Sequence, residues 1–221
     1  MSSRWSWGLS IGLTVLAFAA SAWLYPSLPD RLPTHWNIEG QVDGTGPKAW
    51  VAFGLPGLMI AMMLLFAAIP WLSPAPFKVD AFQPTVSYLM VLVVGLVGYI
   101  HGLTLYAGVR GGVDVGTALI AGMMFLFAAL GNVMGKIRRN FYIGIRVPWT
   151  LASERVWTDT HRLAAWLWMG GGLLGGILTI AGVTPIVAFG ILIIISIVPI
   201  VYSFVLSKRL EKQALVLNQQ D

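Results

Sequence analysis

Residues 185–206 decide the class of fold, because they read PIVAFGILIIISIVPIVYSFVL and contain no charged side chain. A helix needs roughly 20 predominantly apolar residues to cross the hydrocarbon core of a bilayer. Five further segments also meet this requirement, namely residues 5–25, 50–72, 85–108, 115–135 and 163–183. The sequence therefore predicts an all-α integral membrane protein, a six-helix transmembrane bundle. Pro185 suits the first turn of a new helix, so the last two spans are expected to be antiparallel neighbours.

The composition supports this prediction and narrows the classes of function. Hydrophobic residues make up 57% of the chain, charged residues 10%, and the mean hydropathy is +0.78. The chain has no cysteine, which excludes disulfides and thiolate chemistry. Its net charge is +5, but the basic residues flank apolar segments and form no separate basic domain. We expect membrane lipids as partners, no direct nucleic-acid binding, and a single membrane domain over 1–221. Within it, residues 5–72 form two spans with an external loop, and 85–206 form a four-span part.

The distribution of Lys and Arg predicts the orientation, because cytoplasmic segments near span ends carry an excess of these residues. One side of the predicted membrane collects eleven: Arg4, Lys78, Lys136, Arg138, Arg139, Arg146, Arg155, Arg162, Lys208, Arg209 and Lys212. The other side holds three: Arg31, Lys48 and Arg110. Both termini are therefore expected in the cytoplasm, in the cytoplasmic membrane of a bacterium.

The external loop, residues 26–48, is rich in Pro, Gly, Asn and Asp, which favours turns over a helix or an uninterrupted strand. We expect Leu32, Trp36 and Ile38 to pack on the outer helix ends. The residues expected to face a ligand are His35, Trp36, Asn37, Asp43 and Lys48, with Glu39 also exposed. Two interpretations stay open: a docking surface for an extracellular ligand, or an ordered cap that only seals the helix ends.

The internal loop, residues 136–162, is expected to turn and then feed an interfacial helix. Pro148 biases the preceding residue toward an extended backbone, and Gly144 permits unusual dihedral angles. Thr150 is expected to be the N-cap of a helix that runs into the fifth span. On that helix Trp157 and His161, four residues apart, share one face. Arg155 and Asp159 share another face and are expected to form an exposed ion pair.

The basic and aromatic residues of this internal loop have two interpretations. Arg146, Trp149, Trp157 and His161 could form a cytoplasmic recognition surface or a latch that senses helix movement. Alternatively, the arginines bind lipid phosphates while the tryptophans anchor the loop at the interface.

Polar residues inside the spans are candidates for function, since such residues must face protein or water. His101 is one, and its alternative is a neutral histidine bonded to a neighbouring helix, to Thr104 or to a backbone carbonyl. Asn132 has the same two interpretations. No metal-ligand spacing links the residues that could meet near the outer face: His35, Glu39, His101, Asp43 and Asp114. We find no catalytic motif and expect no cofactor, no metal and no enzymatic activity.

Both loops resemble known sequences. The external loop, with Leu32-Pro33-Thr34-His35-Trp36-Asn37 and then Gly40, Asp43 and Lys48, resembles the short membrane-linked domain of unknown function that precedes the SdpI domain. The second stretch resembles the signature of the SdpI immunity-protein family. Its matching residues are Gly131-Asn132, Asn140, Gly144-Ile145-Arg146-Val147-Pro148-Trp149-Thr150-Leu151, Trp157 and His161. Val147 departs from this pattern, where a threonine is expected.

The resemblance implies a bacterial membrane protein that confers resistance to a secreted antimicrobial peptide toxin. It also implies a receptor that holds a cytoplasmic transcriptional repressor at the membrane. A second hypothesis is a membrane enzyme or lipid-handling protein, with His35, Asp43 and His101 gathered at the outer face and Arg146 binding a headgroup phosphate. A third is a small transporter in which His101 and Asn132 line a path.

Overall fold

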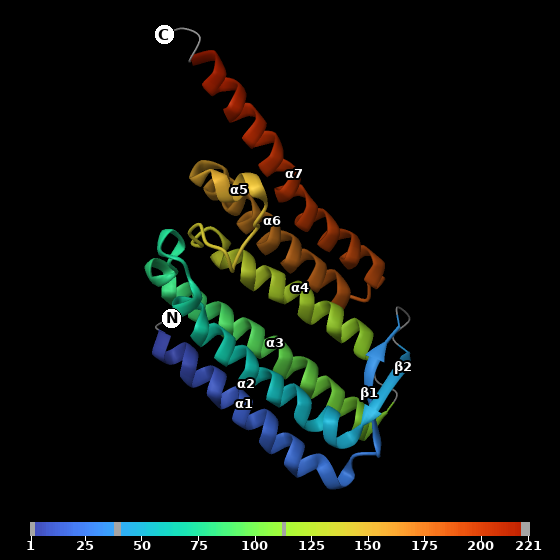
Figure 1. The fold of residues 1–221 in the computed structure, drawn as a ribbon. Coiled ribbons are helices and arrows are strands. Elements are labelled where there is room, and N and C mark those ends of the chain that lie inside the picture. The colour runs from blue at the N-terminus through green and yellow to red at the C-terminus, as the bar shows by residue number, and fades with distance from the viewer. Residues whose placement is uncertain (1–2, 38–40, 112–113, 218–221) are drawn as a thin grey trace.

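A computed structural model describes residues 3–37, 41–111 and 114–217 of the chain. Ile38, Glu39 and Gly40 of the external loop lie outside the described residues. Six helices are long and apolar enough to cross a membrane (Figure 1). They are α1 (Ser3–Leu24), α2 (Lys48–Leu72), α3 (Gln83–Arg110), α4 (Val115–Met134), α6 (Glu154–Ile180) and α7 (Pro185–Leu217). The predicted helical membrane bundle is confirmed.

The last two of these helices extend beyond their apolar spans. α6 begins at Glu154, near the start expected for the helix that runs into the fifth span, and α7 continues to Leu217, past the apolar stretch that ends at residue 206. Both additions contain charged residues that cannot lie in hydrocarbon but are good helix formers. Hydropathy marks where a span leaves the membrane and does not mark where its helix ends. α7 consequently projects past the other helices (Figure 1).

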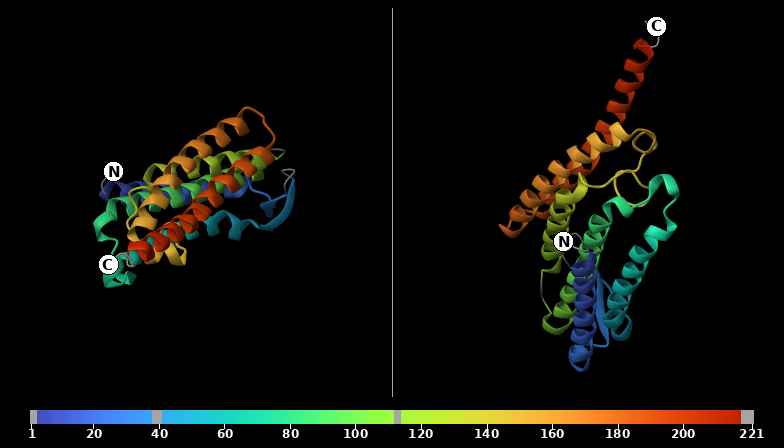
Figure 2. Two further views of the ribbon diagram at one scale, coloured as in Figure 1. Left: turned by 90° about the horizontal axis from the view of Figure 1, so that it is seen from above. Right: turned by 90° about the vertical axis from the view of Figure 1, so that its left-hand side faces the viewer.

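The helices form two groups of three. α1, α2 and α3 pack together, α4, α6 and α7 pack together, and the contact between α3 and α4 joins the groups (Figures 1 and 2). α6 and α7 are neighbours, as expected, and Pro185 is the first residue of α7. We call the end of the bundle that carries β1 and β2 the hairpin end. The opposite end, with the N-terminus of α1 and the short helix α5 (Pro148–Ala152), is the loop end.

The external loop contains a β-hairpin with interrupted pairing, where the sequence favoured turns over a helix or an uninterrupted strand. β1 (Arg31–Trp36) pairs antiparallel with β2 (Val42–Pro47), and the register shifts on both sides of His35. Such irregularities let proline and glycine sit in short strands. Arg31 supports the pair, because its Nε donates to Thr45 Oγ1 at 2.9 Å.

The hairpin is attached to the bundle through one buried side chain. Leu32 is fully buried and belongs to a cluster with Leu28, Val51, Ala52 and Leu105. This cluster joins β1 to α2 and α3 and confirms the expected packing of Leu32 on the helix ends. The hairpin is therefore positioned by the bundle rather than tethered only at its two ends.

The backbones of α4 and α6 lie in close contact. A Cβ atom added at Gly131 would lie 2.4 Å from the Met169 nitrogen, and one added at Gly172 would lie 2.5 Å from the Ala128 nitrogen. Small residues let helix backbones approach in lipid, where van der Waals packing drives helix association. Gly131 and Gly172 therefore serve the packing of α4 against α6 within one chain.

We predict that Gly172→Ala destabilises the protein by about 1–3 kcal/mol, because the new methyl group would meet the backbone of α4. Gly170→Ala is the matched control on the same helix, since nothing lies within 4 Å of its added Cβ. Thermal unfolding of both variants in the same detergent measures the effect. Equal unfolding midpoints would contradict the packing described here.

Candidate functional site

The segment that links α4 to α6 at the loop end is folded around a buried asparagine. Asn140 Nδ2 donates to the carbonyl oxygens of Arg138 at 2.8 Å and Ile143 at 3.0 Å. Its Oδ1 accepts from the backbone nitrogens of Tyr142 at 2.7 Å and Ile143 at 2.8 Å. All the hydrogen-bonding capacity of this amide is thus used to shape the turn.

His161 fixes the next part of this segment. Its Nδ1 lies 2.7 Å from the Trp157 carbonyl oxygen, which can only accept, so Nδ1 carries the proton. Its Nε2 accepts from the Ile145 backbone nitrogen at 3.0 Å, which requires the neutral ring. The Trp157 and His161 rings stack with centroids 4.1 Å apart, and both side chains are buried. The expectation that Trp157 and His161 share one face of the helix is confirmed.

Gly144 is required by the same arrangement. Its φ is +113°, a region that side chains with a Cβ rarely adopt. An added Cβ would also lie 2.4 Å from His161 Nε2. Trp157 fixes the start of the segment, because its Nε1 donates to the Ile137 carbonyl oxygen at 2.8 Å.

The predicted role of Thr150 as N-cap of the long helix is wrong. A separate helix, α5, begins at Pro148, and Thr150 Oγ1 accepts from the Val147 nitrogen at 3.0 Å within it. Ser153 caps α6 instead, accepting from the Val156 nitrogen at 3.3 Å. Val147 has the expected extended backbone. Pro148 already has the φ angle of a helix, so α5 starts there, before Thr150. The backbone is extended at Ser153, which separates α5 from α6.

The remaining residues of the segment lie nearer its surface. Trp149 Nε1 donates to Ser203 Oγ at 2.6 Å and so ties α5 to α7, a contact that the sequence did not predict. Arg139 Nε lies 3.2 Å from Glu154. Arg155 lies 3.9 Å from Asp159, as predicted. Arg146 is exposed and donates to the Phe141 carbonyl oxygen. Most of the signature therefore builds the segment, and its exposed members are Asn132, Arg146 and Pro148.

The hairpin end presents a histidine–carboxylate pair. His35 Nδ1 lies 2.5 Å from Asp43 Oδ1, and their side chains are 71% and 44% exposed. Trp36 is half-buried, and Asn37 Oδ1 accepts from the Gln41 nitrogen at 2.8 Å. Lys48 is turned to the base of the hairpin, with its Nζ 4.8 Å from the centre of the Tyr25 ring. Of the predicted ligand-facing residues, His35 and Asp43 are the two that project.

His101 lies on α3 and packs against α1, away from the exposed pair. Its Nε2 lies 3.0 Å from Ser21 Oγ, which itself lies 2.5 Å from the Ala52 carbonyl oxygen. Because the serine proton goes to this carbonyl, Nε2–H donates to the serine oxygen. Thr104, the partner considered from the sequence, bonds to Ile100 instead. His101 is thus hydrogen-bonded to a neighbouring helix, as expected if it is a structural rather than a functional residue.

The polar residues of the second and third hypotheses are not brought together. Asn132 is exposed on α4 beside α6, in the other group of helices from His101. Within residues 3–37, 41–111 and 114–217, no group of three or more His, Asp or Glu side chains could hold a metal ion.

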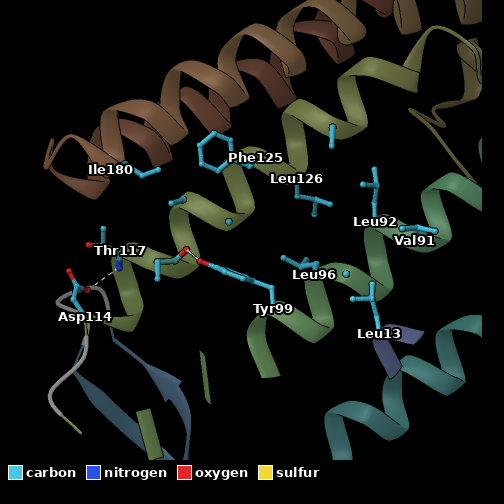
Figure 3. A pocket seen from close by; sticks show the side chains of 15 residues that line it. Leu13, Val91, Leu92, Leu96, Tyr99, Asp114, Thr117, Phe125, Leu126 and Ile180 are labelled. Carbon is cyan, nitrogen blue, oxygen red and sulfur yellow. Dashed lines mark hydrogen bonds between the residues drawn. The ribbon is translucent and has the colours of Figure 1, made fainter. Parts of the chain in front are cut away.

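A groove of about 810 Å³ runs between α3 and α4 (Figure 3). Its lining is apolar along most of its length, with Leu92, Leu96 and Phe125 among the side chains. At the hairpin end it carries Asp114, whose carboxyl pKa is lowered by hydrogen bonds from the hydroxyl and backbone N–H of Thr117. Tyr99 spans the groove and donates to the Ala118 carbonyl oxygen at 2.7 Å.

These features define a multi-pass membrane protein with a hairpin at one end and a hydrogen-bonded segment at the other. The model of the SdpI/YfhL protein family matches residues 136–203, and that of a domain of unknown function (DUF1648) matches residues 12–60. These two matches confirm the resemblance to that family seen in both loops. It is 28% identical over 162 residues to Immunity protein SdpI of Bacillus subtilis (strain 168), covering 71% of this chain and 73% of that protein. No solved structure matches the chain.

We predict that His161→Phe lowers the free energy of unfolding by about 1–3 kcal/mol, because the buried Ile145 N–H loses its acceptor while the ring stack is retained. Arg155→Gln, which breaks an exposed pair on the same helix, should change it by less than about 1 kcal/mol. Denaturant unfolding and the rate of trypsin cleavage after Arg138 and Arg146 measure the effect. Faster cleavage in both variants to the same extent would contradict the role of His161.

Proposed function

We propose that the protein is a non-enzymatic membrane immunity protein that protects its cell against a secreted antimicrobial peptide toxin. The observation that carries this proposal is the similarity to Immunity protein SdpI, which extends over most of both chains. The two family matches support it, because they include the hairpin and the segment between α4 and α6. The protein would then need two exposed surfaces, one toward the toxin and one toward the cell interior.

We place the hairpin end outside and the loop end in the cytoplasm. The uneven division of basic residues supports this orientation, because the loop end carries eleven of the fourteen Lys and Arg residues. A toxin that arrives from outside would therefore meet β1 and β2 first.

His35 and Asp43 are the proposed docking residues for the toxin. Their side chains project from the hairpin, which Leu32 fixes to the bundle and Arg31 braces across the strands. A surface that is already ordered loses little conformational entropy when it binds. The pair offers a peptide both a carboxylate acceptor and an imidazole edge.

The segment between α4 and α6 is the proposed surface for a cytoplasmic repressor. Its buried bonds through Asn140, Trp157 and His161 give it a defined shape, and Arg146 is exposed on it. It also contacts α7 through Trp149 and Ser203, so a shift of α7 would reach it directly. No contact described above favours the enzyme or transporter hypotheses.

The absence of cysteine makes the orientation directly testable by single-cysteine labelling. We predict that Asp43→Cys reacts with a membrane-impermeant maleimide on intact cells, because this side chain is exposed at the hairpin end. Arg155→Cys, also exposed but at the loop end, should react only after the cells are opened. The reverse pattern would overturn the proposed orientation.

We predict that expression of the protein protects a sensitive bacterium against at least one peptide in a panel of secreted, membrane-active toxins. His35→Ala should weaken protection on the order of tenfold, the loss expected for a residue at the centre of an interface. Arg155→Ala is the control, because it is equally exposed but lies at the other end.

Survival is compared at equal abundance of each variant in the membrane. Arg146→Ala should retain protection and lose capture of the cytoplasmic partner, because its side chain lies at the loop end. No protection by the wild-type protein against any toxin would overturn the proposed function.

A further inference from the structure

A second, smaller groove lies between α4 and α6 at the loop end, with a volume of about 250 Å³. Two stripes of residues line it, each at helical spacing. α4 and the turn after it contribute Gly131, Asn132, Gly135 and Lys136, and α6 contributes Arg162, Ala165, Trp166 and Met169. Of the side chains that line it, only Lys136 belongs to a surface proposed for the immunity function, because it begins the segment between α4 and α6.

The backbones of α4 and α6 diverge toward the loop end and open this groove. At Gly131 an added Cβ would lie 2.4 Å from the Met169 nitrogen, which is a backbone clash. At Gly135, one turn later, the nearest atom to an added Cβ is the Ala165 Cβ at 3.9 Å, an ordinary contact. The groove is therefore shut at its deep end and open at the membrane surface.

The mouth of the groove is cationic. Lys136 and Arg162 are both exposed, and within the described ranges 3–37, 41–111 and 114–217 neither forms an ion pair with a carboxylate. Asn132 is exposed beside them and adds an amide donor. Two free cations and an amide suit a phosphate group, which accepts several hydrogen bonds at once.

The wall of the groove is apolar and faces the surrounding lipid. Trp166 is 73% exposed, which places its ring where it can lie against lipid at the interfacial depth that tryptophan prefers. From Arg162 to Met169 the stripe rises about 10 Å along the helix. It passes from charged to apolar over this length, as a lipid does from headgroup to acyl chain.

From this geometry we propose that the groove between α4 and α6 binds one anionic phospholipid, with its phosphate between Lys136 and Arg162 and an acyl chain along Trp166 and Met169. The binding site would couple the lipid to the segment between α4 and α6, because Lys136 begins that segment and Arg162 follows His161. The site does not depend on the immunity function, and its test does not use toxin.

The test measures lipid preference of the purified full-length protein by native mass spectrometry from an equimolar mixture of phosphatidylglycerol and phosphatidylcholine. The double variant Lys136→Gln/Arg162→Gln should lose the preference for phosphatidylglycerol by on the order of tenfold or more. The matched control is Lys78→Gln/Arg138→Gln, which removes two exposed charges from the same end outside the groove. The control should keep the preference.

A lipid and a free phosphate share the same headgroup chemistry, so a second arm adds soluble glycerol 1-phosphate as competitor. Bound phosphatidylglycerol should remain, because the soluble ligand cannot contact the apolar wall. Displacement at comparable concentration would overturn the lipid assignment in favour of a free phosphate ester. Equal losses in both double variants, or no loss in either, would overturn the site itself. All variants are first compared by thermal unfolding to confirm that they fold.

Discussion

The backbone contact between α4 and α6 is the constraint on which the loop end depends. Gly131 and Gly172 let the two helices meet without intervening side chains, which fixes their separation. The chain must then return from the end of α4 to the start of α6 within a defined span. Apart from α5, that span is not helical, so its polar backbone groups need partners other than regular secondary structure.

Asn140, Trp157 and His161 supply those partners. Each is a buried polar side chain whose hydrogen bonds go to backbone atoms rather than to an open site. The stacked rings of Trp157 and His161 occupy the space beneath Gly144, where any Cβ would collide. These residues of the family signature can therefore be required for the shape of the segment rather than for contact with a ligand. The chemistry offered to a partner belongs to their exposed neighbours, above all Arg146.

The hairpin end follows a different principle. There the hairpin packs on α2 and α3 through the buried side chain of Leu32. The polar residues of the hairpin remain free to project, so His35 and Asp43 combine a fixed position with high exposure. His101 looked similar in the sequence but lies between helices, where Ser21 satisfies its Nε2.

The sequence by itself determined the helical membrane class, the six spans and the resemblance to the SdpI/YfhL family, because long apolar segments and the two loop motifs are local properties of the chain. It also predicted the shared face of Trp157 and His161, since helical spacing alone places them together. It did not predict the hairpin, because Pro33 and Gly44 are poor strand residues and their pairing depends on Thr45 and His35, which lie in the opposite strand.

Only the tertiary structure decided which polar residues meet. The bonds from His161 to Ile145, from Trp149 to Ser203 and from His101 to Ser21 join different segments. The groove between Lys136 and Arg162 also exists only because α4 and α6 are neighbours that splay apart. No local pattern encodes that adjacency, since it results from how all six helices share their packing surfaces.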